Sequence, residues 1–407
     1  MDRSLVPWPV AGTGFTRMPQ LLAALAAALD GTGPALAPTA GPGEPLPGQV
    51  RADVALAVRT SGSTGTPRRV LLGGDALRAS AERTHARLGG PGRWLLALPL
   101  DHVAGLQVLV RSVVARTAPV VTGSSPEAIA SALRGMGPND DPVGGRRRAA
   151  RLYTALVPTQ LHRIVRQSAG GVLPERLAPL RLLDAILVGG ASTPDALRAA
   201  ALDLGLPVVT TYGMTETCGG CVYDGVPLDG VRIELDDGVV RIAGPTLAAG
   251  YLVDGKVRST SFEDDDDGTR WFRTADLGRI DADGRLTVLG RLDDVLVTGG
   301  VKVAPAAVER VLATAAGVSQ VCVVGVPDSE WGTSVTAVVV PGPQDQPDLA
   351  QLREAVTRTL GSAAAPRELV LVRSLPLLGP GKVDRAAVAR LAIDATRPPD
   401  VDWPEPV

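Results

Sequence analysis

The clearest chemistry in this sequence lies in a short loop that is rich in glycine and hydroxyl side chains. The loop RTSGSTGTPRRV runs from Arg59 to Val70. Backbone amides of such a segment can form a concavity that binds an anion, and serine and threonine hydroxyls add further donors. The loop therefore suits a phosphate group, although the Walker A pattern G-x-x-x-x-G-K-[ST] occurs nowhere in the sequence. A flexible surface turn is the alternative interpretation of the loop taken alone.

Other polar residues stand at or near the predicted ends of strands. Open α/β sheets bind ligands beyond the carboxyl ends of their strands, so these residues are candidates for a site. They are His102 in LPLDHVAGL, Gly189 and Gly190 in VGGAS, Thr215 and Glu216 in TTYGMTETCGG, Asp276 in RTADLG, and Lys382 in GPGKVDR. Each has an ordinary structural alternative. Asp276 could cap a turn, Lys382 and Glu216 could be solvated charges, and His102 could be a satisfied interfacial histidine.

Short apolar runs alternate with helical patterns between Val54 and about Gly213, which predicts a mostly parallel sheet flanked by helices. The strand candidates are residues 54–58, 94–98, 118–122, 152–157, 185–189 and 207–212. Helical patterns include residues 75–88 and 194–205. The segment from Gly31 to Gly48 is rich in glycine and proline and is predicted to be a loop.

Two further patterns follow along the chain. From Val231 short alternating strands are joined by DDG and ADG turns, which predicts hairpins in a β-rich subdomain. After Arg291 helices and strands form a compact α+β unit of roughly a hundred residues. We therefore predict an α/β protein with a large N-terminal domain over residues 1–290 and a small α+β C-terminal domain over residues 291–407.

Composition argues against several classes of protein. With 407 residues, of which 45% are hydrophobic and 21% charged, the chain has the makeup of a globular protein. A net charge of -2 gives no support for binding to nucleic acid or to an anionic membrane. LLAALAAAL, Leu21 to Leu29, is too short to span a bilayer, so no membrane insertion is expected. Three cysteines do not make a disulfide framework, which favours the reducing cytoplasm.

The motifs, taken together and in this order, resemble the adenylate-forming superfamily of acyl-CoA synthetases, peptide-synthetase adenylation domains and luciferases. The resemblance extends from about Val54 to Arg385 and rests on YGMTE (212–216), FRTADLG (272–278), GRLDDVLVTGG (290–300) and PLLGPGKVDR (376–385). The phosphate loop of this family is close to TSGTTGxPKG. Here Arg68 replaces the lysine, so that a guanidinium fork stands in place of a point charge, and Arg69 replaces the last glycine.

The resemblance implies a reaction in which ATP adenylates a carboxylic acid, pyrophosphate leaves, and the thiol of CoA then attacks the acyl-adenylate. Since both reacting groups of the first step are anions, catalysis relies on positioning and positive charge. By resemblance, Lys382 neutralises charge at the α-phosphate and the attacking carboxylate, and Glu216 holds Mg²⁺. The nucleotide contacts implied in the same way are Thr60, Ser61, Ser63, Thr64, Gly189, Gly190, Tyr212, Thr215, Asp276 and Arg291. The C-terminal domain is then mobile, with a hinge at residues 291–294 and Asp293 as the hinge residue.

The acyl substrate is suggested by LPLDHVAGLQVLVRS, by ALVPTQL and by a shortened N-terminus, which resemble actinobacterial o-succinylbenzoate–CoA ligases of menaquinone synthesis. That acid carries two carboxylates, and the resemblance makes His102, Arg111, Thr159 and Ser192 candidates for its site, with His102 also a catalytic candidate. A benzoate or medium-chain acyl-CoA ligase is the alternative within the family. A non-catalytic nucleotide-binding protein of the same fold is the alternative from another class. The feature that argues against it is the joint retention of Thr215, Glu216, Asp276, Asp293 and Lys382. A homodimer is one option for the oligomeric state.

Two other patterns are interpreted as structural. Cys218 and Cys221 have C-x-x-C spacing, but no second pair accompanies them and Cys322 is remote in sequence. We therefore expect small residues that line the acyl pocket rather than a zinc site. EDDDDG, Glu263 to Gly268, lacks the spacing of an EF-hand and is predicted to be a solvated loop.

Overall fold

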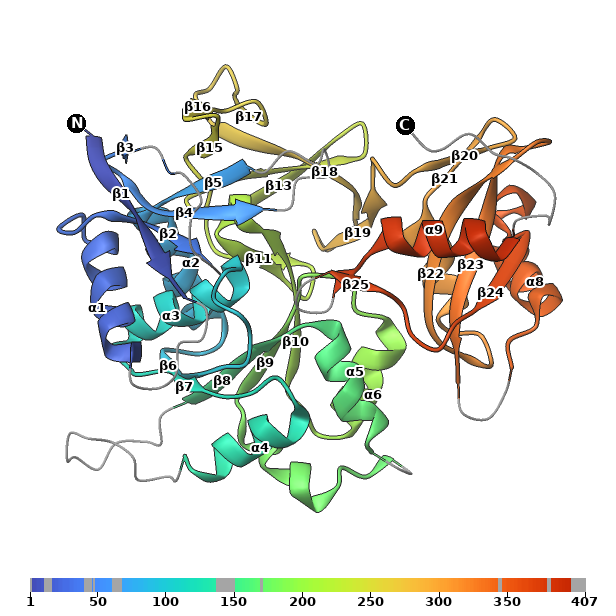
Figure 1. The fold of residues 1–407 in the computed structure, drawn as a ribbon, viewed down its shortest axis with the longest axis horizontal. Helices are drawn as coiled ribbons and strands as arrows, with labels where there is room; N and C mark the ends of the chain where they lie inside the picture. The colour runs from blue at the N-terminus through green and yellow to red at the C-terminus, as the bar shows by residue number, and fades with distance from the viewer. Residues whose placement is uncertain are drawn as a thin grey trace. The chain divides into compact units, whose positions relative to one another are not determined.

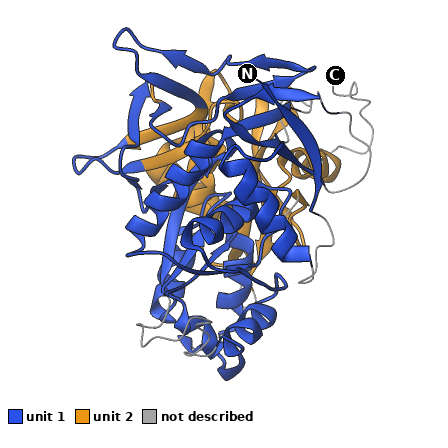
Figure 2. Cartoon of the chain, turned by 90° about the vertical axis from the view of Figure 1, so that its left-hand side faces the viewer, with its two compact units in different colours: residues 1–236, 240–274, 280–286 blue, residues 237–239, 275–279, 287–407 orange. Residues whose placement is uncertain are grey.

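The computed structural model describes residues 2–10, 17–39, 46, 48–60, 68–136, 151–168, 171–342, 346–378 and 382–396. The chain divides into two compact units, which Figure 2 colours separately. The first unit comprises residues 1–236, 240–274 and 280–286, and the second comprises residues 237–239, 275–279 and 287–407. The predicted α/β class with a larger N-terminal and a smaller C-terminal part is confirmed, whereas a domain boundary at residue 290 stays a prediction.

One seven-stranded sheet of the first unit carries most of the predicted site. Its strands lie in the order β12-β11-β10-β9-β8-β6-β7, and the neighbours from β7 to β10 pair in parallel. β9, with the sequence AILV, is buried along its whole length, as expected for a parallel strand that is covered on both faces. The strands are β6 (Gly92–Leu96), β7 (Val120–Val121), β8 (Arg151–Leu156), β9 (Ala185–Val188), β10 (Val208–Met214), β11 (Gly219–Tyr223) and β12 (Val226–Pro227).

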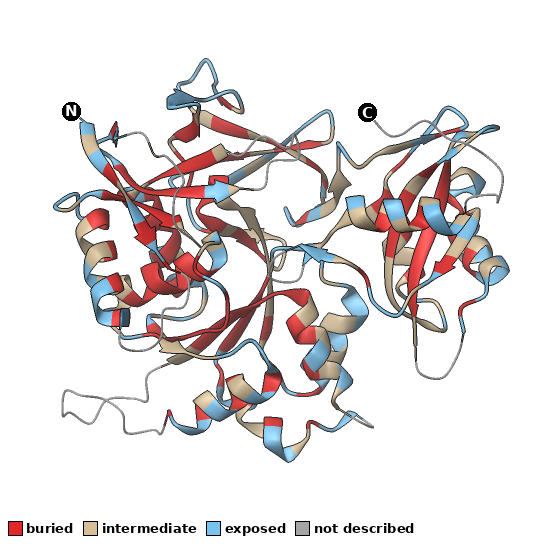
Figure 3. Cartoon of the chain, in the orientation of Figure 1, coloured by how far each residue is buried: buried red, intermediate tan, exposed pale blue. Residues whose placement is uncertain are grey.

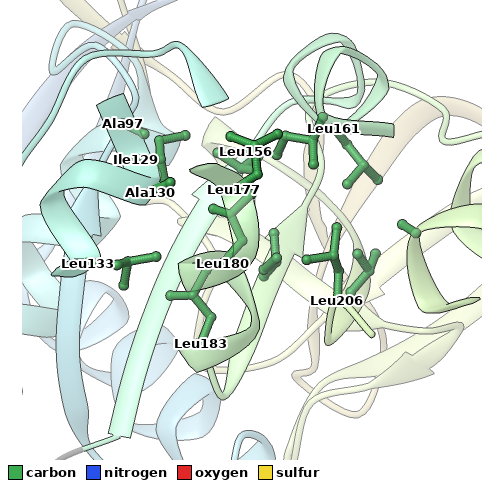
Figure 4. Packing of buried hydrophobic residues seen from close by; sticks show 14 of the residues in the cluster. Ala97, Ile129, Ala130, Leu133, Leu156, Leu161, Leu177, Leu180, Leu183 and Leu206 are labelled. Carbon is green, nitrogen blue, oxygen red and sulfur yellow. The ribbon is translucent and has the colours of Figure 1, made fainter. Parts of the chain in front are cut away.

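Helices cover this parallel sheet, as the sequence predicts (Figure 1). Their apolar side chains interlock with those of β8, β9 and β10 in a core that is rich in leucine, part of which Figure 4 shows. Proline at the first turn starts α4 and α5, where its missing N–H is not needed, and the Ser125 hydroxyl caps α4 by accepting from the Ala128 N–H. The helices of this unit are α1 (Met18–Leu29), α2 (Gly74–Arg87), α3 (Val103–Ala115), α4 (Pro126–Arg134), α5 (Pro158–Arg166), η3 (Glu175–Leu182), α6 (Asp195–Asp203) and η4 (Thr215–Thr217).

A second sheet of the first unit corrects two expectations. Its order is β16-β15-β5-β4-β2-β1-β3, so the strand predicted at residues 54–58 pairs here and not in the parallel sheet. The segment predicted to be a loop contains β2, whose residues are buried between β1 and β4. Pairing on both sides overrides the weak local signal of the sequence ALAPT. The strands are β1 (Asp2–Pro9), β2 (Ala35–Thr39), β3 (Gln49–Arg51), β4 (Val54–Thr60), β5 (Arg68–Gly73), β15 (Gly250–Val253) and β16 (Lys256–Arg258).

The predicted β-rich segment is a five-stranded sheet of hairpins. Asp237 and Gly238 both have positive φ in the turn between β13 and β14, which is typical of the tight turn expected for a DDG sequence. Residues of EDDDDG form the exposed turn between β17 and β18, so the predicted solvated loop is confirmed. The strands are β13 (Arg232–Asp236), β14 (Val239–Ala243), β17 (Phe262–Asp264), β18 (Arg270–Ile280) and β19 (Leu286–Arg291).

The second unit has a three-stranded sheet, β22-β23-β24, with helices on both faces. Side chains alternate along β22, so that Val323 packs with α7 and α8 while Cys322 and Val324 pack with α9. The burial colours of Figure 3 show both cores. The elements are β20 (Leu296–Thr298), β21 (Val301–Val303), α7 (Pro305–Leu312), β22 (Val318–Asp328), β23 (Gly332–Pro341), α8 (Leu349–Leu360), η5 (Ser362–Ala364), β24 (Glu368–Leu371), β25 (Leu377–Leu378), β26 (Lys382–Val383) and α9 (Arg385–Thr396). Within the described residues, no helix has the length and apolar character needed to cross a membrane.

Candidate active site

The parallel sheet brings several predicted site residues to one edge. β6, β8, β9 and β10 are neighbours in register, with Leu95 opposite Thr154, Leu156 opposite Val188, and Val188 opposite Thr210. Their carboxyl ends therefore meet at the same edge, where open α/β sheets bind ligands. The residues that follow these ends are His102 after β6, Thr159 after β8, Gly189, Gly190 and Ser192 after β9, and Thr215 and Glu216 after β10.

The glycine pair after β9 is required by close packing at this edge. A Cβ at Gly189 would lie 2.3 Å from the Thr211 Oγ1 on the neighbouring strand, which leaves no room for a side chain. Gly190 has a φ of +82°, a conformation that other residues adopt only under strain. The pair thus leaves backbone, and no side chain, at the rim of the sheet, with Tyr212 on the adjacent strand β10.

A tight turn holds Thr215 and Glu216 at the end of β10. The Thr217 Oγ1 accepts from the Met214 N–H at 2.9 Å and donates to the Gly219 carbonyl at 2.7 Å. The backbone of Glu216 is held as well, because its carbonyl accepts from the Ala248 N–H at 2.8 Å. The turn therefore fixes the direction in which these two side chains leave the sheet.

The carboxylate of Glu216 is buried and has two partners in the first unit. The Tyr251 hydroxyl donates to its Oε1 at 3.1 Å, and the Arg68 Nη2 lies 3.5 Å from the same oxygen. The Arg68 guanidinium also stacks 4.2 Å from the centre of the Tyr251 ring. Burial, and then the charge of Glu216, raise the pKa of Tyr251, which stays protonated and able to donate. Arg68, the departure from the family loop, is thus the counter-charge of the predicted metal ligand.

Mg²⁺ is compatible with this carboxylate. The ion prefers oxygen ligands and usually binds through one or two carboxylates together with phosphate oxygens and waters. In the part of the chain that the structure describes, no group of three His, Cys, Asp or Glu side chains could hold a metal alone. A single buried carboxylate fits the ion when a nucleotide supplies the other ligands.

The phosphate loop itself, with Ser61, Ser63 and Thr64, lies outside the described residues. The strands on either side of it are described. Thr60 ends β4 and pairs with Arg68 at the start of β5. The two ends of the loop are therefore adjacent, and its contacts with phosphate stay a prediction.

His102 is the residue before the first turn of α3, as expected, and its side chain is 47% exposed. Its Nε2 lies 3.7 Å from Asp101 Oδ1. Ser192 is exposed, and Thr159 lies in the first turn of α5, where Gln160 Oε1 accepts from the Val157 N–H. These three residues are accessible at the strand edge, and their roles stay predictions.

Arg111 lies elsewhere, two turns along α3 from His102, and is only 3% exposed. Its guanidinium carbon is 4.8 Å from the centre of the Trp94 ring, and its Nη2 donates to the Tyr223 hydroxyl at 3.3 Å. Its Nε has no hydrogen-bond partner, and no carboxylate of the described residues forms an ion pair with it. Burial lowers the pKa of Arg111. An arginine that is buried without a counter-charge is costly unless a ligand supplies one.

A cluster of hydrogen-bonded polar side chains extends from Arg111 into the space between α2, α3 and β11. The Thr84 and Tyr223 hydroxyls are 2.9 Å apart, and the Trp94 Nε1–H donates to His85 Nε2 at 3.2 Å. Burial, and then the charge of Arg111, lower the pKa of His85 to about 4, so that this histidine is neutral at pH 7. His85, Trp94, Tyr223 and Tyr251 are missed by the sequence analysis because each gains its meaning only from a partner on another element.

The cysteines behave as small buried residues. Cys218 and Cys221 are free and fully buried. Burial raises the pKa of both thiols, that of Cys221 to about 12, so neither is a thiolate at neutral pH. The Cys218 carbonyl accepts from Ser80 Oγ and Gln107 Nε2 beside α3. This arrangement is consistent with the structural interpretation, and a place in the acyl pocket stays a prediction.

The remaining predicted residues belong to the second unit. Asp276 is buried within β18, so it does not cap a turn, and the Arg291 Nη1 lies 3.6 Å from its Oδ1. Arg291 also pairs with Asp293 Oδ2 at 2.7 Å. Lys382 is exposed on the two-residue strand β26, opposite Leu378. The structure thus groups Asp276, Arg291 and Asp293 and places Lys382 separately, just after residues 379–381, which are not described.

A parallel sheet with polar turns at one edge, followed by a small α+β unit, defines an α/β protein built to bind a ligand at its strand ends. Two family models match the chain, the AMP-binding enzyme over residues 21–252 and the AMP-binding enzyme C-terminal domain over residues 307–382. The chain belongs to this family, the adenylate-forming superfamily that its motifs resemble.

Named relatives agree with this membership. A protein named probable 2-succinylbenzoate–CoA ligase from Mycobacterium tuberculosis is 44% identical over 384 residues, which cover 91% of this chain and 94% of the relative. The structure of ATP-bound MatB from Rhodopseudomonas palustris is 26% identical with a TM-score of 0.69, covering 85% of this chain and 69% of that one. E. coli MenE with a bound analogue of OSB-AMS is 26% identical with a TM-score of 0.62, covering 93% and 80%.

Proposed function

We propose that this protein is an ATP-dependent ligase that converts o-succinylbenzoate into its CoA thioester through an acyl-adenylate, as a step of menaquinone synthesis in the cytoplasm. ATP, the acid and CoA are its small-molecule partners. The 44% identity to the M. tuberculosis relative, over nearly the full length of both chains, supports the activity. The strand-edge arrangement supports the site.

In the first step, a carboxylate oxygen of the acid attacks the α-phosphorus of ATP, and the bond to the bridging oxygen breaks with its electron pair leaving on pyrophosphate. Lys382 neutralises the charge that builds between the two anions. Thr215, which the turn after β10 holds at the strand edge, is assigned the contact with the α-phosphate. In the second step the sulfur of CoA attacks the acyl carbon, AMP leaves, and the thiol proton passes to solvent.

Glu216 and Arg68 share the charge balance at the phosphates. Glu216 holds Mg²⁺, and the ion when bound offsets negative charge on the phosphate oxygens. Arg68 pairs with Glu216 in the structure, and a guanidinium is equally suited to bidentate contact with phosphate. Arg68 is therefore suited to balance the charge of Glu216 or of the outer phosphates. Asp276 accepts hydrogen bonds from the ribose hydroxyls, and the backbone at Gly189 and Gly190 lies against the adenine together with Tyr212.

The observation that carries the substrate assignment is Arg111. A buried guanidinium with an unpartnered Nε and no carboxylate partner among the described residues is suited to pair with an anion that a ligand supplies. The ring carboxylate of o-succinylbenzoate is such an anion, since the other carboxylate is the one that reacts. Because His85 is neutral, it adds no second positive charge beside Arg111, and one anion balances the charge of this cluster.

The test compares o-succinylbenzoate with 3-benzoylpropionate, the same acid without the ring carboxylate. Pyrophosphate release with ATP and Mg²⁺ is measured for the wild type, Arg111→Met and Arg111→Lys. We expect Arg111→Met to lower kcat/KM for the diacid about 10- to 100-fold, the range for a charge-assisted hydrogen bond, and to leave the monoacid nearly unchanged. Arg181→Met is the matched control, because Arg181 donates to the Leu204 carbonyl and lies on η3.

Two outcomes would contradict the proposal. If Arg111→Met lowered both acids equally, Arg111 would not bind the second carboxylate. If neither acid released pyrophosphate while benzoate or medium-chain acids did, the alternative ligase activity would replace the one proposed.

A further inference from the structure

Two adjacent aspartates of the second unit are bound to two different arginines. Asp293 Oδ2 pairs with Arg291 Nη2 at 2.7 Å, and Arg291 also faces Asp276 in β18. Asp294 Oδ2 instead lies 3.4 Å from the Nε of Arg385, the first residue of α9. The chain therefore passes from one arginine-anchored group to another within a single peptide unit.

Arg385 contacts residues of several elements of the second unit, and the sequence motif that contains it does not predict these contacts. Its Nη2 donates to Glu309 Oε2 on α7 at 2.8 Å, and its Nη1 donates to the Val323 carbonyl on β22 at 3.0 Å. Glu309 Oε1 in turn accepts from the Val323 N–H at 2.8 Å. All three guanidinium nitrogens thus have partners, an arrangement that the planar fork of arginine permits and a lysine ammonium does not reproduce. Although burial opposes it, the charge of Glu309 and its neighbours raises the pKa of Arg385.

This anchor stands three residues after Lys382. The intervening backbone is also held, because the Asp384 N–H donates to the Pro376 carbonyl and the Asp384 Oδ1 accepts from the Ala387 N–H, both at 2.9 Å. The pairing of Lys382 with Leu378 belongs to a ladder of only two residues per strand, which contributes little rigidity. The firm attachment of the lysine segment therefore lies at Arg385.

We propose that Arg385 is a positioning residue for Lys382. It fixes the segment that carries the lysine to β22, to Glu309 and to Asp294, so that the ammonium group reaches the adenylation step with little conformational freedom. This inference rests on the proposed function, in which Lys382 serves adenylation and not thioester formation. The inference also narrows the hinge predicted at residues 291–294. Asp294 is held to the segment that carries Lys382, so the pivot is expected at Asp293.

The experiment measures the two half-reactions separately for Arg385→Met, Arg385→Lys and Asp294→Asn. Adenylation is followed by pyrophosphate release from o-succinylbenzoate and ATP, and thioester formation by the reaction of supplied acyl-adenylate with CoA. A displacement of about 1 Å can cost about 100-fold in rate, so we expect Arg385→Met to lower kcat of adenylation about 10- to 100-fold. The KM for ATP and the thioester half-reaction should stay within about threefold of wild type.

Two variants refine the test. Arg385→Lys should recover part of the adenylation rate, since it keeps the charge but not the fork. Asp294→Asn should lower it only a few-fold, because this pair is about one-third exposed and Glu309 still holds Arg385. Arg353→Met is the matched control, since Arg353 lies on α8 and donates to the Pro366 carbonyl. It should leave both half-reactions unchanged.

The half-reaction rates distinguish failure of the positioning role from failure of the proposed function. Equal losses in both half-reactions of Arg385→Lys or Asp294→Asn, with the melting temperature of wild type, would overturn the positioning role. Unchanged adenylation in all three variants would overturn it as well, and if Lys382→Ala still lost adenylation, the proposed function would stand. Normal adenylation by Lys382→Ala would instead contradict the function assigned to the lysine. If Arg385→Met does not fold, the results for Asp294→Asn and Arg385→Lys decide whether Arg385 positions Lys382.

Discussion

Two arginines, one in each unit, have opposite surroundings: Arg111 is buried, and Arg385 is one-third exposed. Arg385 faces the carboxylates of Glu309 and Asp294 and a backbone carbonyl, and its pKa is raised. Arg111 is more deeply buried, lies over the Trp94 ring, donates to the Tyr223 hydroxyl, and has a pKa lowered by burial. The same side chain thus appears once with its charge balanced inside the protein and once without a counter-charge among the described residues.

The difference separates an arginine whose charge is balanced by carboxylates of its own unit from one for which the described residues supply no counter-charge. A guanidinium surrounded by carboxylates stabilises the native structure, and removal of one partner leaves the others unpaired. A guanidinium with only an aromatic face and a hydroxyl gains about 2 kcal/mol from the ring, which does not repay its desolvation. On the proposals above, Arg385 acts through Lys382 and Arg111 binds the substrate.

The largest effect is expected for substitution of Lys382, the residue that Arg385 is proposed to position. Lys382→Ala should lower adenylation by about 10²–10³, because one preorganised charge is lost where charge develops, and should largely spare the reaction of supplied acyl-adenylate with CoA. Both half-reactions are measured as above, with Lys256→Ala on the exposed strand β16 as control. Equal loss in both would show that Lys382 is not the adenylation lysine.

Asp293→Pro tests whether the hinge lies at Asp293, directly before Asp294 and the contacts of Arg385. Proline fixes φ near -65° and removes the N–H, so a residue that must change φ during the reaction cycle can no longer do so. We expect thioester formation to fall about tenfold or more while adenylation persists, the reverse of Lys382→Ala. Asp293→Ala, which loses the contact with Arg291 but keeps the backbone free, is the control. Normal thioester formation by Asp293→Pro would remove Asp293 from the hinge.

Unfolding in denaturant compares the two arginines directly. Arg385→Met removes the ion pair of Glu309, which keeps only its hydrogen bond from the Val323 N–H among the contacts described above. It should lower the free energy of unfolding by about 2–3 kcal/mol, less than for a fully buried pair because Arg385 is one-third exposed. Arg111→Met removes an uncompensated charge and should change stability by less than about 1 kcal/mol in either direction. A large destabilisation by Arg111→Met would mean that its charge is balanced internally, and the comparison would fail.

The smallest effect concerns the histidine beside Arg111. His85 has a pKa of about 4 in the folded state and 6.5 in the unfolded state, so the unfolded state binds the proton more readily. The stability that neutral His85 contributes is therefore fully present above pH 6.5 and is lost as the pH falls towards 4. Between pH 7 and pH 5 the wild type should lose about 1–2 kcal/mol more than His85→Gln, whose amide still accepts from Trp94 but does not titrate. His162 titrates in both proteins, so its contribution cancels. Equal losses in the two proteins would show that His85 is not buried neutral.

Much of the site could be predicted from short sequence patterns. The apolar run AILV before the glycine pair, and the segment VVTTYGM that leads into TETCGG, locate strand ends. Parallel strands place those ends at one edge whatever the details of packing. The order of the motifs likewise identified the family, which the matches over residues 21–252 and 307–382 confirm. The segment containing β2 was predicted wrongly as a loop, because glycine and proline counts describe the chain locally while its pairing with β1 and β4 is not local.

The sequence by itself determined most of the strands, the turns and the motif positions of this protein, with β2 as an exception, since these follow from periodicity and from backbone preferences within a few residues. The tertiary structure alone decided which polar groups meet. Thr84 and Tyr223 stand 139 residues apart in the chain, Arg111 and Tyr223 112 apart, and Arg385 and Glu309 76 apart. Whether a buried charge finds a counter-charge depends on such encounters, because the electrostatic energy of an arginine is set by the atoms within a few ångströms of it and by the water they exclude, and no local pattern encodes either.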